Sequence, residues 1–308
     1  MKEPDLTKLK RISIRDRKSK VNISHLARSV KREDSLCDFI DSLPDILQAK
    51  DLKCLARELI EIKAGGGKVL WMMGGHVVKC GLSPIIIDLM KEGFVDFVAM
   101  NGGASIHDFE LAVFGETSED VKEGLDKGMF GVARETAALM NSAISDGCGI
   151  GESLCEKVEE VLGEFREKSI LWQAYKMGIC VTVHTAIGAD IIHQHPEMDG
   201  SAFGEASFSD FKRLMGFLPL LEGGAVVNLG SAVILPEVFL KALNASRNLT
   251  GLPKKFTRAN FDMMPTYREI KNVVERTGEG KEFILVGRHE VLIPLFSVII
   301  KCMNERKG

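Results

Sequence analysis

The sequence predicts an α/β fold in which a parallel sheet is covered by helices on both faces. Short apolar runs of strand length alternate with segments of helical periodicity along most of the chain. These runs are apolar throughout, as is typical of strands that are buried on both faces. No linker, low-complexity segment or fixed-period repeat separates them. We therefore predict a single α/β domain over residues 33–308, preceded by an arm over residues 1–32.

The first elements can be justified in order from the N-terminus. Residues 11–14 of the arm are expected to form a short strand. Residues 35–43 are predicted to form an amphipathic helix because apolar side chains recur at helical spacing before a proline. Residues 51–63 form a second predicted helix, which ends at three consecutive glycines. The first strand of the sheet is expected at residues 68–73, an apolar run that stops at a pair of glycines.

The alternation of strands and helices continues to the C-terminus. Five further strands are expected, at residues 95–100, 180–183, 225–229, 255–262 and 283–286. Helices are expected at residues 82–92, 118–145 (with a glycine-rich break), 153–168, 169–176, 208–221, 236–246 and 289–303. In the helix over residues 208–221, Asp210 and Lys212 are expected on a solvated face.

The composition is that of a folded chain without a membrane span. The 308 residues are 45% apolar and 27% charged, with a formal net charge of -3, which excludes a disordered tail. No apolar run approaches the roughly 18 residues of a membrane helix, and the N-terminus lacks the apolar core of a signal peptide. Seven cysteines without a C-x-x-C pair predict a reducing, cytoplasmic location and neither disulfides nor a zinc knuckle.

The charge is distributed unevenly along the chain. Residues 1–32 contain eleven Lys and Arg and three Asp and Glu, a net charge of +8, so the remaining residues carry -11. A basic arm can bind nucleic acid, but this arm has no aromatic residue that could stack on bases. We therefore expect it to pack on its own acidic body or on a neighbouring subunit, and we predict neither a nucleic-acid nor a membrane partner.

Polar or glycine-rich segments follow four of the predicted strands. Ligands bind at the carboxyl ends of strands in open α/β sheets, and glycine lets a phosphate approach backbone N–H groups at helix starts. Neither G-x-G-x-x-G nor G-x-x-x-x-G-K-[ST] is present. Together the four segments predict a nucleotide or anion pocket. They are GGH (74–76), NGGASIHD (101–108), HTAIGAD (184–190) and LGSA (229–232).

His107 and Asp108 follow one of these glycine turns, with Glu110 close behind. They form a candidate proton-transfer pair, because a nearby carboxylate raises the basicity of an imidazole and orients its ring. Asp108 could equally cap the helix that starts here, beside an incidental histidine. After the third strand, Asp190 is a candidate anchor for an amine or a ribose, with helix capping as the alternative.

Two further groups of polar residues have alternative interpretations. His193 and His195 have the spacing of a metal pair, but they precede a proline in a predicted loop, so solvated side chains are favoured and no metal is predicted. His289 and Glu290 follow the last strand. They either reach the same pocket or place a carboxylate at the start of the final helix.

Four segments of the chain resemble the deoxyhypusine synthase family. They are VDFVAMNGGASIHDFE (95–110), SILWQAYKMGICVTVHTAIGADII (169–192), AVVNLGSAVILPEVFLKAL (225–243) and GRHEVLIPLF (287–296). The resemblance implies a Rossmann-like fold, NAD as the cofactor, and tetramers with sites at a subunit interface. Members of the family dehydrogenate a polyamine such as spermidine and transfer its aminobutyl group to a lysine.

This resemblance implies roles for individual residues. His107 would stand near the family's acidic polyamine contact, Asp190 would match its polyamine-binding aspartate, and Glu237 would fall about where the family has an active-site histidine. The residues expected to hold the cofactor, including the glycines after the first strand, are Gly74, Gly75, Asn101, Gly102, Gly103, Thr185, Gly230 and Ser231.

The family's catalytic lysine has no matching residue. Counting back thirteen residues from His289, to the place of that lysine, gives Arg276. Arginine stays protonated near neutral pH and cannot form an imine. Lys271 and Lys281 lie nearby, but no feature selects either. Because arginine suits an anionic group, Arg276 and His289 are predicted to bind a carboxylate or phosphate, and the protein is predicted not to make deoxyhypusine.

A shorter stretch, NGGASIHDFELAVFG (101–115), resembles the N-x-x-x-x-H-D-x-E-x-A-L-F-G segment of an NAD-dependent ornithine cyclodeaminase family. In that family, oxidation by NAD activates an amine for the loss of ammonia. The His, Asp and Glu of the segment correspond to His107, Asp108 and Glu110.

Our leading hypothesis is an NAD-dependent enzyme that acts on a small amine or amino acid through transient oxidation at the carbon bearing nitrogen. It is expected to be a homo-oligomer, either a dimer or a tetramer. The alternatives are a non-catalytic ligand-binding relative, an ornithine cyclodeaminase-like ammonia lyase, and polyamine transfer with a displaced lysine. The candidate catalytic residues are His107, Asp108, Asp190, Glu237, Arg276 and His289.

Overall fold

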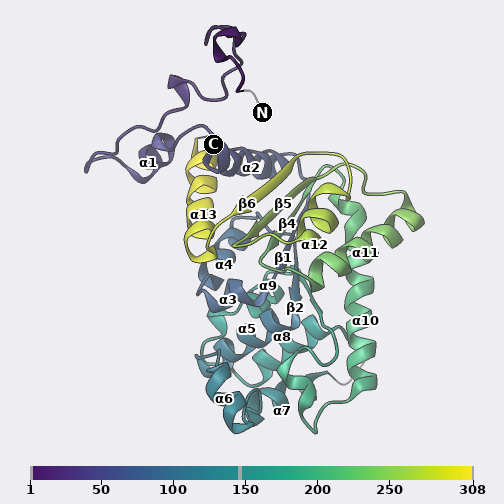
Figure 1. Ribbon diagram of the computed structural model, residues 1–308. Helices are drawn as coiled ribbons and strands as arrows, with labels where there is room; N and C mark the ends of the chain where they lie inside the picture. Colours follow the sequence, from purple (N-terminus) through teal and green to yellow (C-terminus); the bar gives the residue numbers. More distant parts are fainter. Residues whose placement is uncertain (1–2, 145–147, 307–308) are drawn as a thin grey trace.

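A computed structural model describes residues 3–144 and 148–306 of the chain. Its centre is a six-stranded parallel sheet with helices on both faces (Figure 1), which confirms the predicted fold class. The apolar runs become strands because both of their faces are covered, and β1, β2 and β4 contain no exposed residue. The strands are β1 (Val69–Met73), β2 (Phe97–Asn101), β3 (Cys180–His184), β4 (Ala225–Leu229), β5 (Thr257–Asp262) and β6 (Glu282–Val286).

The strand order in the sheet is β3-β2-β1-β4-β5-β6. The chain builds outward from β1 to β3 on one side and from β4 to β6 on the other, so the direction of winding reverses between β1 and β4. In register, Met73 pairs with both Met100 and Leu229, and Asn101 pairs with His184. Because all strands are parallel, their carboxyl ends lie along one edge, and the reversal point is where such sheets bind ligands.

Helices from distant parts of the chain cover the two faces (Figure 1). On one face, Trp71 and Met73 belong to the larger apolar core, whereas Leu70 and Met72 face the smaller core under α11. The helices that contribute to the larger core include α2 (Leu47–Ala64), α3 (Gly75–Lys79), α4 (Ser83–Lys91), α5 (Gly102–Phe114), α8 (Ile150–Glu160), α9 (Ile170–Lys176) and α13 (His289–Glu305). α1 (Leu36–Ser42), α7 (Arg134–Ala143) and α10 (Gly200–Phe217) also place side chains in it. The remaining helices are α6 (Val121–Lys127), α11 (Ile234–Thr250) and α12 (Tyr267–Glu269).

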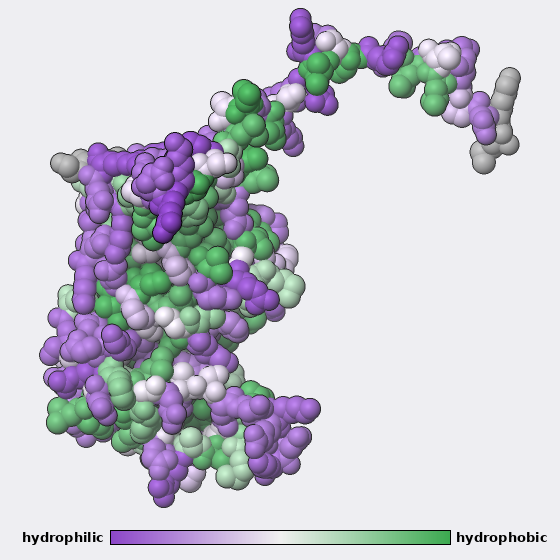
Figure 2. Space-filling view, turned by 90° about the vertical axis from the view of Figure 1, so that its left-hand side faces the viewer, coloured by the Kyte–Doolittle hydropathy of each residue, from purple (hydrophilic) through white to green (hydrophobic). Residues whose placement is uncertain are grey.

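The N-terminal arm extends away from the body, and hydrophobic and hydrophilic residues are interspersed along it (Figure 2). Two short 3₁₀ turns, Leu6–Lys8 and Ile23–His25, are its described secondary structure, so the strand expected at residues 11–14 was wrong. Its apolar side chains are exposed, Leu6 to 76% and Ile23 to 87%. Within the described residues, no helix is both long and apolar enough to cross a bilayer.

A disulfide joins Cys37 of α1 to Cys302 of α13. The prediction that the chain forms no disulfide was therefore wrong. The two cysteines are 265 residues apart and are brought together by the packing of α1 on α13. No local spacing rule signals such a pair. Arg306 and Asp41 form an ion pair beside the disulfide, at 2.7 Å.

Two predictions about helices were also wrong. The helix expected over residues 153–168 ends at Glu160, because Leu162 takes a left-handed backbone conformation with φ of 50°. The helix expected from residue 208 begins instead at Gly200, so Asp210 lies well inside it. Asp210 is fully buried rather than solvated. Ser145, the end of another predicted segment, lies outside the described residues.

Candidate active site

Two glycines face each other at the reversal point of the sheet. Gly74 follows β1 and Gly230 follows β4. A Cβ atom on Gly74 would lie 2.1 Å from the carbonyl oxygen of Gly230, and Gly230 has φ of 62°. Neither position tolerates a side chain without a shift of the backbone. The two loops therefore touch through their backbones at the place where α/β sheets bind ligands.

The helix α5 starts directly after β2 with two more glycines. Asn101 caps it, because the Asn101 side chain accepts a hydrogen bond from Ala104 N–H at 2.9 Å. A Cβ atom on Gly102 would lie 2.0 Å from Oδ2 of Asp190. The Asp190 carboxylate therefore lies against the first residue of α5, although almost ninety residues separate them. Gly102 gives it the room to do so.

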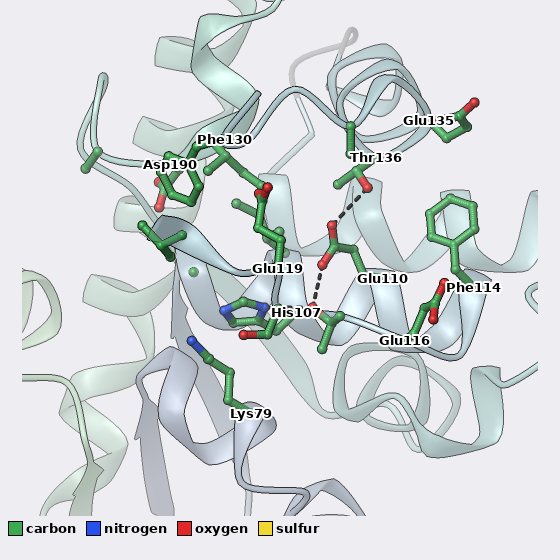
Figure 3. A pocket seen from close by; sticks show the side chains of 18 residues that line it. Lys79, His107, Glu110, Phe114, Glu116, Glu119, Phe130, Glu135, Thr136 and Asp190 are labelled. Atoms are coloured by element: carbon green, nitrogen blue, oxygen red, sulfur yellow. Dashed lines mark hydrogen bonds between the residues drawn. The ribbon is translucent and has the colours of Figure 1, made fainter. Parts of the chain in front are cut away.

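A cavity of about 680 Å³ lies beside α5, and Figure 3 shows His107, Lys79 and Asp190 around it. The loop that joins α5 to α6 and the start of α7 form its other walls. Among the described residues that line the cavity, acidic side chains outnumber basic ones, with five Glu or Asp and one lysine. These are Glu110, Glu116, Glu119, Glu135 and Asp190, with Lys79.

His107 is held in this cavity by hydrogen bonds. Its Nδ1 atom lies 2.8 Å from Oγ1 of Thr117, and Thr117 in turn donates to a carboxylate oxygen of Glu110. Thr136 donates to the other oxygen of Glu110 at 2.9 Å. Figure 3 shows the Lys79 side chain pointing toward the imidazole. The histidine is therefore tethered through one ring nitrogen to a partly buried chain of polar groups.

The surroundings shift the pKa of both candidate groups. Burial above all, with smaller contributions from the neighbouring Lys79 and His76, lowers the pKa of His107 to about 4. Burial raises the pKa of Asp190 to about 6. At neutral pH the imidazole is therefore neutral and able to accept a proton. Asp190 is mostly ionised at that pH, and a bound cation would complete its ionisation.

The structure separates Asp108 from the cavity. Asp108 is fully buried, and its carboxylate accepts hydrogen bonds from Ser169 Oγ at 2.5 Å, Ile170 N–H at 2.8 Å and Leu171 N–H at 3.0 Å. It therefore caps α9, a helix 60 residues further along the chain, instead of the helix in which it lies. Successive residues of a helix point about 100° apart, so His107 and Asp108 face different neighbours.

The remaining predicted catalytic residues lie outside the described lining of this cavity. Glu237, on α11, accepts a hydrogen bond from Asn272 at 2.9 Å and pairs with Arg268. Arg276 is exposed and stacks on the Tyr267 ring at 5.3 Å. His289 is buried at the start of α13, where its Nε2 atom lies 3.2 Å from the carbonyl oxygen of Phe261.

The predicted cofactor residues divide between several strand ends. Gly103 lines the large cavity, whereas Thr185 lines a second hollow of about 310 Å³ at the end of β3, together with His184 and Phe208. Ser231 is buried after β4, and its hydroxyl accepts a hydrogen bond from Leu235 N–H at 3.3 Å. These residues share the carboxyl edge of the sheet without forming one continuous lining.

His193 and His195 have structural contacts. The Nδ1 atom of His193 accepts hydrogen bonds from Gly188 N–H at 3.1 Å and Asp190 N–H at 3.3 Å. His195 hydrogen-bonds to the Gly131 carbonyl oxygen at 2.8 Å. The His193 imidazole therefore supports the loop that presents Asp190, and His195 is hydrogen-bonded to the segment between α6 and α7, rather than lying in solvent as expected.

The cavity residues that sequence reasoning missed include Lys79, Thr117, Glu119 and Thr136. Lys79 ends the short helix that follows the first glycine pair. Its closeness to the end of β1 could therefore have marked it as a candidate site residue. Thr117 and Glu119 belong to a loop without any recognisable motif. Thr136 begins a helix that no strand precedes. Only tertiary packing brings these side chains to His107.

Comparisons with known proteins agree with this fold. The family model described as arginine dihydrolase ArgZ-like, C-terminal, Rossmann fold, matches residues 53–162. The ornithine cyclodeaminase of Methanothermobacter thermautotrophicus is 33% identical over 64 residues, which is 21% of this chain and 16% of the relative. That of Archaeoglobus fulgidus is 30% identical over the same length. The chain thus matches about one sixth of the length of these curated relatives.

Solved structures share the overall architecture at low sequence identity. A LOR/SDH protein from Methanococcus maripaludis S2 has a TM-score of 0.54 at 17% identity, covering 84% of this chain and 71% of its own. The ternary complex of AgrE with ornithine and NAD+ has a TM-score of 0.53 at 16% identity, covering 83% and 33%. A protein described as a deoxyhypusine synthase from Entamoeba histolytica has a TM-score of 0.53 at 12% identity, covering 89% and 95%. The chain therefore has a Rossmann fold related to that of deoxyhypusine synthase.

Proposed function

We propose that this protein is an NAD-dependent enzyme that acts on a small amine or amino acid through transient oxidation at the carbon bearing nitrogen. The observation that carries the proposal is the cavity at the carboxyl edge of the sheet, in which acidic side chains surround a neutral histidine. The carboxylates attract a cationic amine. The imidazole of His107 is unprotonated at physiological pH, so an amine bound in the cavity could pass a proton to it, and its lowered pKa makes that uptake transient.

The strand ends suit a dinucleotide in three respects. The winding reverses between β1 and β4, and the loops after both strands are glycines in direct contact. A Cβ atom on Gly103 would meet nothing nearer than 3.7 Å, so the backbone at this position of the first turn of α5 is uncrowded. The Nδ1 atom of His289, packed against Gly230, is buried without a hydrogen-bond partner among the described residues.

The residues that we propose to hold NAD are those at these strand ends: Gly74, Gly75, Asn101, Gly102, Gly103, Thr185, Gly230 and Ser231. When bound, NAD would supply a two-electron acceptor for the amine-bearing carbon. The chain's own groups would bind and orient the substrate and move its proton.

An amino acid with a second amino group, such as ornithine, matches the charges of the cavity. Asp190 and Glu119 would bind ammonium groups, and Lys79 would bind the carboxylate. His107 would take the proton released as the carbon–nitrogen bond is oxidised. The ornithine cyclodeaminase relatives and the AgrE complex with ornithine and NAD+ support this choice of substrate.

Ammonia loss is favoured over aminobutyl transfer. A transfer reaction through an imine needs a lysine that can be deprotonated in the site. Arg276 stands where that lysine would be expected, and it stacks on Tyr267 instead. The lysines nearest in sequence form ion pairs, Lys271 with Glu275 and Lys281 with Glu58.

The proposal is tested by adding NAD+ and ornithine to the purified protein and measuring thermal stabilisation, NADH absorbance and released ammonia. We expect NAD+ to raise the Tm and ornithine to yield ammonia. His107→Gln should lower kcat by about 100-fold or more, and Asp190→Asn should mainly raise KM. The control is Glu160→Gln, which changes an exposed carboxylate on α8. Absence of both NAD+ binding and turnover, with ornithine, lysine, arginine and spermidine alike, would reject the proposal.

A further inference from the structure

A chain of hydrogen bonds runs from His107 through Thr117 and Glu110 to Thr136. Glu110 is central, because each of its carboxylate oxygens receives one threonine hydroxyl. Glu110 lies one helical turn beyond His107 on the same face of α5. It can therefore be linked to the imidazole by a hydrogen bond through Thr117, whereas the adjacent Asp108 points elsewhere. Thr117 comes from the following loop and closes the link.

The protons in this chain can be counted. An ionised carboxylate only accepts hydrogen bonds, so both threonine hydroxyls must donate to Glu110. A hydroxyl has a single proton, and that of Thr117 is already committed. In the 2.8 Å contact with His107, Thr117 must therefore accept, and the donor must be the N–H at Nδ1. A neutral imidazole with its proton on Nδ1 has its lone pair on Nε2.

We infer that Thr117 and Glu110 are positioning residues that fix His107 as the Nδ1–H tautomer and so make Nε2 the proton acceptor of the cavity. When Nε2 takes a proton, the ring becomes an imidazolium with an N–H on each nitrogen. The negative charge of Glu110, one hydroxyl away, stabilises that cation. No electron transfer is involved, and the proton returns by the same nitrogen. The inference depends on the proposed function only for the origin of that proton.

The position of Thr117 adds a consequence. Thr117 lies in the loop over residues 115–120, which also contributes Glu116, Ser118 and Glu119 to the cavity wall. Ser118 has a left-handed backbone conformation, with φ of 72°. The same loop therefore forms part of the cavity wall and supplies the acceptor for Nδ1–H. Movement of this loop away from His107 would let the imidazole exchange its proton between the two nitrogens.

The test is a nuclear magnetic resonance measurement of the ring nitrogens in protein labelled with 15N-histidine, without cofactor or substrate. The spectrum of His107→Gln identifies the signals of His107 among the seven histidines. In the unaltered protein at pH 7, we expect the His107 signals of an Nδ1–H tautomer. Thr117→Val removes the acceptor and should shift the tautomer ratio toward Nε2–H by about fivefold to tenfold, the worth of one hydrogen bond.

Two further variants separate positioning from general damage. Thr117→Ser keeps the hydroxyl, so its spectrum should show the same Nδ1–H signals as the unaltered protein. If instead the threonine methyl group mattered only for packing, Thr117→Ser would lose these signals as Thr117→Val does. Thr136→Val removes only the distant bond to Glu110 and should leave the tautomer of His107 unchanged. An Nε2–H tautomer in the unaltered protein, or an unchanged ratio in Thr117→Val, overturns the inference. Since no NAD is needed, failure of the proposed function would leave this result standing.

Discussion

Replacement of Asp210 by asparagine should stabilise the protein, by the largest amount at pH 8 and by a smaller amount at pH 5. The side chain has no exposed surface, and its Oδ2 atom accepts hydrogen bonds from Gly151 N–H at 2.9 Å and Val183 N–H at 2.8 Å. Asparagine has the same shape and can accept both bonds through its amide oxygen. It differs from aspartate in remaining neutral at every pH.

The magnitude follows from the pKa of the buried carboxyl group. Burial raises the pKa of Asp210 from 3.8 to about 7, although two backbone hydrogen bonds and Arg213 lower it. The folded state therefore binds the proton more tightly than the unfolded state. The stability that the group contributes is full below pH 3.8 and is lost as the pH rises through 7. A shift of about 3 units at about 1.36 kcal/mol each corresponds to about 4 kcal/mol over the whole pH range, of which about 3 kcal/mol falls between pH 5 and pH 8.

The assay is urea denaturation at pH 5, 6, 7 and 8, with the difference in free energy of unfolding between variant and unaltered protein plotted against pH. We expect this difference to grow from pH 5 to pH 8 in favour of Asp210→Asn. Asp126→Asn, a change of the same charge on the exposed helix α6, is the control and should give a flat line. A difference that stays constant or shrinks with rising pH would refute the reasoning that burial dominates at this site.

Two other substitutions test the backbone contact and the covalent link. Gly74→Ala should cost about 1–3 kcal/mol of stability and weaken any binding at the strand ends, because its Cβ would overlap the Gly230 carbonyl oxygen. Gly216→Ala, in α10 with nothing within 4 Å of its Cβ, should instead be neutral or stabilising. Cys37→Ser should lower the free energy of unfolding by about 5 kcal/mol, as chain entropy predicts for so long a loop, whereas Cys180→Ser at an exposed free cysteine should not. Equal Tm values for members of either pair would contradict these expectations.

The sheet could be predicted because the residue pattern that identifies each strand lies within the strand itself. Each buried strand is a short apolar run that ends at glycine or a polar residue, and the six runs were placed to within a few residues. The parallel arrangement followed from the alternation with helices. The general location of the site followed in turn, since the carboxyl ends of parallel strands meet at one edge.

What could not be predicted depends on contacts between distant segments. Asp210 looked like a solvated residue because its partners lie 59 and 27 residues away. Asp108 was the expected partner of His107, with Glu110 only close behind it. The packing of α9 makes Asp108 a helix cap, and the packing of the loop after α5 links Glu110 to the imidazole instead. No pattern within either segment contains that distinction.

The disulfide between Cys37 and Cys302 also decides how the molecule bears mechanical load. A force that pulls on the two ends of the chain enters through the arm and through the last turn of α13, which lie at the same end of the molecule (Figure 1). It crosses from α1 to α13 through the sulfur–sulfur bond, so the six strands carry none of it while that bond is intact. Only the extended arm would lengthen. After reduction, the same pull would be transmitted directly to the sheet.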